Sequence, residues 1–224
     1  MNNSLAIIYF SRHARSEARH KIFCSGPAAL NLKIAQQLYR HSLKEICKTN
    51  LPFFCFTEEK QKGSTFSERL ANAFQEVFEA GYTSAIAVGS DTPGLDAAQI
   101  LQAATGLHHS PVVAGSTFQG GVYLFGMEKK SFNRKLFNDL PWQTASLSAR
   151  LQQIFPEILL LPALSEINTE QHLKVLTTGP QKINKIFLQL LSFISSFSIG
   201  KYNSVPTAFQ SQVFCLRQIP GRAP

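Results

Sequence analysis

An α/β domain with a mostly parallel central sheet is the fold class that this sequence predicts. Three observations support it: short apolar runs rich in strand-forming residues recur along the 224 residues, segments with helical spacing separate them, and the sequence contains no internal repeat. A chain of this length with regular alternation usually forms one domain. We therefore expect a three-layer α/β/α domain over residues 1–180, an amphipathic helix over 181–200 and an irregular tail over 201–224.

The individual elements follow from local patterns. Leu5–Phe10 is apolar without alternation, which is typical of a strand buried on both faces of a parallel sheet, and it runs into a basic loop. Pro27 suits the start of the next helix, and Ser64 or Thr65 with Glu68 resembles a capping box. After the basic loop we expect helix 29–47, strand 51–56, helix 65–80, strand 85–89, helix 96–104, strands 111–114 and 122–125, helices 131–137 and 145–154, strand 158–161 and helix 169–176.

The segment 181–200 carries apolar residues at helical spacing with polar residues opposite them. It is too short for a transmembrane span, which needs roughly 20 apolar residues. Its polar face is also poor in Lys and Arg for a membrane-surface anchor. Packing on its own domain is the favoured interpretation, and a homodimer contact or a membrane surface are the alternatives.

The cysteines and the N-terminus predict a cytoplasmic protein. The four cysteines have neither the spacing of a metal site nor that of a disulfide framework, which indicates reduced thiols. The first apolar run is too short for a signal peptide and follows no positive cluster. We therefore expect a cytoplasmic location and no transmembrane segment.

A net charge of +8 predicts an anionic partner. Charge alone does not separate nucleic acid, an anionic membrane surface and phosphorylated small molecules. The sequence contains no recognisable nucleic-acid-binding module, so we expect no nucleic acid partner, and a compact anion such as a diphosphate fits better. The basic residues concentrate after the first strand, at Arg12, His13, Arg15, Arg19, His20 and Lys21.

Two groups of polar or glycine residues follow predicted strands. Asp91 lies in a cluster of turn formers after strand 85–89, and the paired glycines Gly120 and Gly121 precede strand 122–125. Ligands of such sheets bind at the carboxyl ends of strands, so Asp91 and the basic loop are expected to share one mouth. Asp91 has a simpler alternative role, since an Asp at this position can cap the turn or helix that follows. The glycine pair can likewise be a tight connection.

Several short sequence motifs, in the same order along the chain, resemble those of the glycosyltransferase A-like family often labelled arsenosugar-biosynthesis glycosyltransferases. The resemblance spans residues 5–176 and implies the fold of a nucleotide-diphospho-sugar transferase. The motifs are Val88-Gly89-Ser90-Asp91-Thr92-Pro93-Gly94-Leu95, Gln119-Gly120-Gly121-Val122-Tyr123-Leu124-Phe125-Gly126, Leu140-Pro141-Trp142-Gln143-Thr144, Leu161-Pro162-Ala163-Leu164 and Glu166-Ile167-Asn168-Thr169.

The resemblance also implies a set of site residues. Asp91 holds a divalent metal, Mg²⁺ or Mn²⁺, against the nucleotide diphosphate, with Asn168 or Glu166 as a weak second ligand. Three basic residues lie near the phosphates, and the glycine pair shapes the acceptor side. The basic residues are Arg12, Arg19 and Lys21, and the glycines are Gly120 and Gly121.

The sequence departs from the family pattern at charged positions. The family has Lys-Thr-Arg-Leu after the first strand, and this chain has basic residues only nearby. An acidic residue is usual where Gln119 stands, and a carboxylate where Asn168 stands. Amide oxygens bring less charge to a cation, so metal affinity is expected to fall.

The leading hypothesis is metal-assisted transfer of a sugar from a nucleotide-diphosphate donor to an unidentified acceptor. Nucleotidyl transfer on the same fold is the nearest alternative. A catalytically degenerate protein that binds nucleotides or a protein partner is the alternative from another class. Trp142 can stack on a sugar or base, although a half-buried packing role is the commoner one for a single tryptophan.

Overall fold

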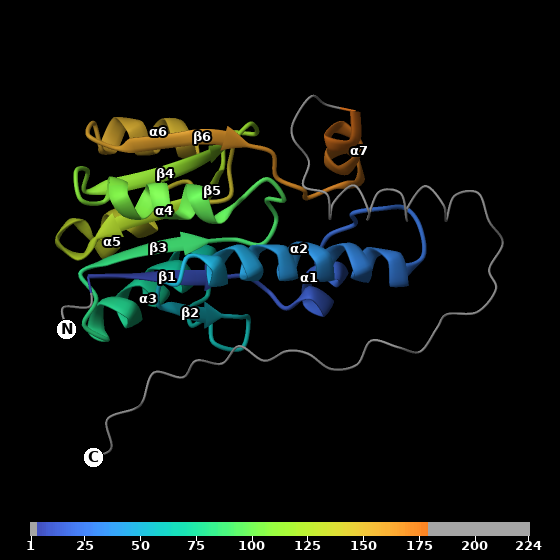
Figure 1. The fold of residues 1–224 in the computed structure, drawn as a ribbon, viewed down its shortest axis with the longest axis horizontal. Coiled ribbons are helices and arrows are strands. Elements are labelled where there is room, and N and C mark those ends of the chain that lie inside the picture. Colours follow the sequence, from blue (N-terminus) through green and yellow to red (C-terminus); the bar gives the residue numbers. More distant parts are fainter. Residues whose placement is uncertain (1–3, 179–224) are drawn as a thin grey trace, which may run out of the picture.

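The computed structural model describes residues 4–178, and the predicted helix 181–200 and tail 201–224 lie outside that part of the chain. Strands and helices alternate along it (Figure 1). None of these helices combines the length and the apolar character that crossing a membrane requires. In order, the elements are β1 (Leu5–Phe10), α1 (Ala14–His20), α2 (Ala28–Lys48), β2 (Phe53–Phe56), α3 (Phe66–Glu79), β3 (Ser84–Val88), α4 (Ala97–Gly106), β4 (Val112–Thr117), β5 (Val122–Glu128), the 3-10 turn Lys129–Ser131, α5 (Arg134–Asn138), α6 (Leu147–Ile154), β6 (Leu159–Leu164) and α7 (Glu170–Thr178).

The strands form one sheet in the order β2-β1-β3-β5-β4-β6. β5 pairs antiparallel with both of its neighbours, and every other pairing is parallel. The predicted mostly parallel sheet is therefore confirmed. β5 continues to Glu128, beyond its predicted end at residue 125, because it stays paired with β3 as far as Ser84.

Helices cover both faces of this sheet, which gives the predicted three layers (Figure 1). Alternate strand residues face opposite sides: Ile8 belongs to the apolar cluster with α3, α5 and α6, whereas Ile7 belongs to the cluster with α2 and α4. α3 begins at the predicted capping box, formed by Thr65 and Glu68. The core therefore fixes the strand ends from both sides.

The segment after β1 was expected to be a basic loop, and that prediction is wrong for Ala14–His20, which is helix α1. Ala14 and Ala18 pack against a third apolar cluster that includes α2 and Leu173 of α7. Figure 1 places α1 and α7 beyond the carboxyl ends of the parallel strands. The basic residues are thus held on a packed helix at the edge where ligands of such sheets bind.

Candidate active site

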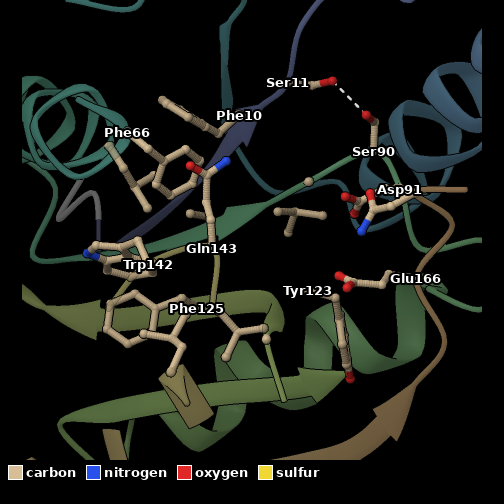
Figure 2. A pocket seen from close by; sticks show the side chains of 18 of the residues that line it. Phe10, Ser11, Phe66, Ser90, Asp91, Tyr123, Phe125, Trp142, Gln143 and Glu166 are labelled. Carbon is tan, nitrogen blue, oxygen red and sulfur yellow. Dashed lines mark hydrogen bonds between the residues drawn. The ribbon is translucent and has the colours of Figure 1, made fainter. Parts of the chain in front are cut away.

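A cleft of about 530 Å³ opens at the carboxyl ends of β1 and β3 (Figure 2). Segments far apart in the sequence line it, including α1, the turn after β3, the turn before β5 and the segment after β6. The expectation that the basic segment and Asp91 share one mouth is confirmed, because Lys21 and Asp91 are in direct contact.

Arg12, Glu17, Lys21 and Asp91 form what we call the charged end of this cleft. Lys21 Nζ lies 2.6 Å from Glu17 Oε1 and 3.2 Å from Asp91 Oδ2. Arg12 Nη1 lies 3.4 Å from Glu17 Oε2. Burial lowers the pKa of Lys21, but Asp91 and Glu17 outweigh it, and the pKa ends above its ordinary value. Lys21 is therefore a fixed positive charge between two carboxylates.

Asp91 lines the cleft and does not cap the helix that follows it. Asp96, not Asp91, is the N-cap of α4, and its side chain accepts from the Gln99 amide. The backbone of Asp91 is tied to the segment after β6, since Ile167 N donates to its carbonyl at 2.7 Å. That bond brings Glu166 to the same part of the cleft.

Glu166 is the carboxylate that follows β6. Figure 2 shows the carboxylates of Asp91 and Glu166 both directed into the cleft. Burial raises the pKa of Glu166 above its ordinary value and Asp91 raises it further, while Lys21 and a hydrogen bond with Asn168 act in the opposite direction. Glu166 thus takes up a proton more readily than an ordinary glutamate.

Phe10, Phe66, Phe125 and Trp142 form the aromatic end of the cleft (Figure 2). Phe10 and Phe66 meet edge to face with ring centroids 5.6 Å apart, and Phe125 and Trp142 do so at 5.4 Å. Trp142 Nε1 donates to the Phe137 carbonyl at 2.7 Å. Trp142 is half-buried and packed, as the commoner interpretation had it, and it also lines the cleft.

Ser11 and Ser90 lie at the ends of β1 and β3. Ser11 Oγ donates to Ser90 Oγ at 2.7 Å, the dashed line in Figure 2. Both residues line the cleft. The bond therefore joins the two strand ends that carry Arg12 and Asp91.

The other predicted site residues divide into two groups. Gly121 and Asn168 line the cleft together with Arg12, Lys21 and Asp91. Arg19 is exposed and lines a separate shallow hollow beside Glu58. Gly120, with φ +87°, packs so closely that a Cβ would lie 2.0 Å from the Ala145 carbonyl oxygen, so its missing side chain serves the packing of that turn.

Sequence reasoning missed Glu17 and Gln143. Glu17 is buried at the charged end, and its i, i+4 spacing to Lys21 was a usable signal once a helix is assigned there. Gln143 lines the cleft with φ 63°, a left-handed conformation that non-glycine residues seldom adopt. No sequence pattern announces that conformation for a glutamine.

The fold is that of the nucleotide-diphospho-sugar transferases. A protein from Desulfovibrio desulfuricans, provisionally assigned as a nucleotide-diphospho-sugar transferase, superimposes with a TM-score of 0.63 at 20% sequence identity, over 88% of this chain and 96% of that one. Residues 25–144 match the family described as "Uncharacterized protein conserved in bacteria (DUF2064)". The chain belongs to that family.

Two further solved structures are more distantly similar to this chain. One is CMP:2-keto-3-deoxy-manno-octonic acid synthetase complexed with CTP, with a TM-score of 0.43 at 10% identity over 77% of this chain and 96% of that one. The other is a Mycobacterium tuberculosis protein complexed with manganese, at 0.45 and 10% over 80% of this chain and 100% of that one. No curated protein is significantly similar to this chain.

Proposed function

We propose that this protein transfers a sugar from a nucleotide-diphosphate donor to an acceptor hydroxyl. The observation that carries the proposal is the charged end, where Lys21 and Arg12 line a cleft at the strand ends of this fold. The guanidinium of Arg12 and the ammonium of Lys21 are donors that suit diphosphate oxygens, and the aromatic end offers rings for contact with a sugar or base.

The reaction breaks the bond between the anomeric carbon and the diphosphate, whose oxygen keeps the electron pair. Positive groups beside that oxygen stabilise the charge that develops there, which is the role we assign to Lys21 and Arg12. The acceptor oxygen forms the new bond to the anomeric carbon, and its proton passes to the Glu166 carboxylate. A raised pKa suits Glu166 to that task, because a general base works best with a pKa near the working pH.

Mg²⁺ or Mn²⁺ is the cofactor that the family resemblance implies for Asp91 and Asn168. Within residues 4–178, no group of three or more His, Cys, Asp or Glu side chains is arranged to hold a metal ion. Asp91 is ion-paired with Lys21, Asn168 brings no charge, and the pKa of Glu166 is raised. This donor set fits a divalent cation poorly, so the steps above use only the chain's own residues.

The test is a thermal-shift panel of nucleoside diphosphates, nucleoside triphosphates and nucleotide sugars, each with Mg²⁺, Mn²⁺ or EDTA. We expect a nucleotide sugar to raise Tm and to release nucleoside diphosphate on incubation with acceptor sugars. Arg12→Gln should weaken that stabilisation, and Arg19→Gln is the matched control because Arg19 lies outside the cleft.

Other outcomes would replace the proposal. Stabilisation by a triphosphate with release of pyrophosphate would make the protein a nucleotidyltransferase. No stabilisation by any nucleotide would leave the degenerate, partner-binding hypothesis in its place.

A further inference from the structure

Lys21 is held in position by more than its two ion pairs. It is the C-cap residue of α1, and its backbone carbonyl accepts from Asn31 Nδ2 at 2.8 Å. The same Asn31 side chain, which is buried, accepts from Phe23 N at 2.7 Å. The backbone that carries the ammonium is therefore anchored to α2, and Glu17 and Asp91 fix the head group.

We propose that the Lys21 ammonium takes the place at Asp91 where a divalent cation would bind, so that Lys21 and Arg12 hold a donor diphosphate without metal. The second half of this inference rests on the proposed function, whereas the first half concerns only the Asp91 carboxylate and its cation.

The position of the Lys21 ammonium disfavours a metal ion on the Asp91 carboxylate. Mg²⁺ bound to a carboxylate sits at roughly 2.1 Å from its oxygen. Lys21 Nζ already lies 3.2 Å from Asp91 Oδ2. A divalent ion on that carboxylate would therefore meet a positive charge within a few ångströms, in a partly buried place where such repulsion is poorly screened.

The neighbouring donors offset that repulsion only in part, since Glu166 is the one further carboxylate in the described cleft lining besides Asp91 and Glu17. Gln119 and Asn168 stand in the cleft lining where the resemblance leads one to expect carboxylates. Of the remaining carboxylates, Glu17 is engaged by both Arg12 and Lys21. The cleft lining thus has amides at Gln119 and Asn168 and an ammonium group beside Asp91.

Mn²⁺ binding to the full chain, followed by the electron paramagnetic resonance of free Mn²⁺, tests the first half without any nucleotide. We expect no submillimolar site in wild type. Lys21→Met should gain Mn²⁺ affinity by at least about tenfold, because a like charge has been removed from the carboxylate. Adding Asp91→Asn to Lys21→Met should abolish the gain.

Two controls make that result specific. Lys48→Met removes a lysine paired with the nearly buried Glu45 outside the cleft and should behave as wild type. Lys21→Arg keeps the positive charge and should likewise show no gain in Mn²⁺ affinity. Wild-type Mn²⁺ binding that Asp91→Asn removes would overturn the inference, as would a folded Lys21→Met variant with no gain.

Nucleoside diphosphate binding in EDTA, by calorimetry, tests the second half. We expect wild type to bind equally well in EDTA and in Mg²⁺, with Lys21→Met weakened in EDTA and partly restored by Mn²⁺. Wild-type binding that requires metal would overturn the inference and leave the proposed function standing. If no nucleotide binds under either condition, the proposed function fails, and with it the second half, while the Mn²⁺ titration still decides the first.

Discussion

The two ends of the cleft are built by different forces. The aromatic end is continuous with the apolar core, since Phe125 is buried in the same cluster as Phe74 and α3. The charged end is a chain of ion pairs between α1 and the turn after β3, with no apolar side chain among its members. One end is thus shaped by close packing and the other by charge. Substitutions should therefore lower stability most at the aromatic end and ligand binding most at the charged end.

Phe125→Ala should have the largest effect on stability. Phe125 is 2% exposed and packs against Phe74, Phe137 and Trp142. Truncating a buried Phe in a core costs about 3–5 kcal/mol of unfolding free energy. Urea denaturation followed by Trp142 fluorescence measures it, with circular dichroism as a second probe because Trp142 itself contacts the mutated ring.

Phe118→Ala is the matched control. Phe118 is 61% exposed, so its loss should change the unfolding free energy by no more than about 0.5 kcal/mol. Equal losses in the two variants would show that the aromatic end is not part of the core, and the contrast between the ends would collapse.

Glu17→Gln should have an intermediate effect on stability that responds only weakly to salt. Glu17 is buried and contacts Lys21 and Arg12, so an uncharged amide there should cost about 1–2 kcal/mol of unfolding free energy. Urea denaturation measures this loss, and because these partly buried ion pairs are poorly screened, added NaCl should change the gap to wild type only slightly.

Glu76→Gln provides the comparison for a surface pair. Glu76 lies 3.3 Å from Lys62, with side chains that are 51% and 75% exposed, and its substitution should cost no more than about 0.5 kcal/mol. A Glu17→Gln cost as small as this one would mean that the charged end is not held by its ion pairs.

The sequence predicted the apolar elements of the fold better than the charged end of the cleft, for a physical reason. Apolar periodicity records burial, so β1, α3 and the strand-end position of Asp91 were found from it. α1 was missed because its seven residues carry charges and only small apolar side chains, which leaves no periodic pattern. With α1 unrecognised, Arg19 was grouped with Lys21, although the helix turns Arg19 away from the cleft.

The ion pairs of Glu17 show which features of the charged end a single sequence does not predict. Its pairing with Lys21 needs the helix, and its pairing with Arg12 needs the turn that brings β1 back toward α1. Both are consequences of tertiary packing against α2 and α7 rather than of local pattern. Charged residues carry information about a site only once the fold has placed them.

Glu58→Gln should have the smallest effect, a slight loss of stability near neutral pH that disappears in acid. The carboxylate of Glu58 accepts from His13 N, the N-cap residue of α1, at 2.6 Å. Burial raises its pKa, but the backbone hydrogen bonds outweigh burial, and the pKa ends below its ordinary value of 4.5. A lowered folded-state pKa stabilises the fold above the unfolded pKa, and that contribution is lost as the pH falls through the folded value.

Tm measured from about pH 6 to pH 3 should therefore fall less steeply in Glu58→Gln than in wild type, because the variant has no carboxylate to protonate there. Glu59→Gln is the control, since Glu59 is the exposed neighbour. A parallel fall in all three proteins would mean that Glu58 does not anchor α1. The basic helix at the charged end would then depend on its contacts with α2 and α7 alone.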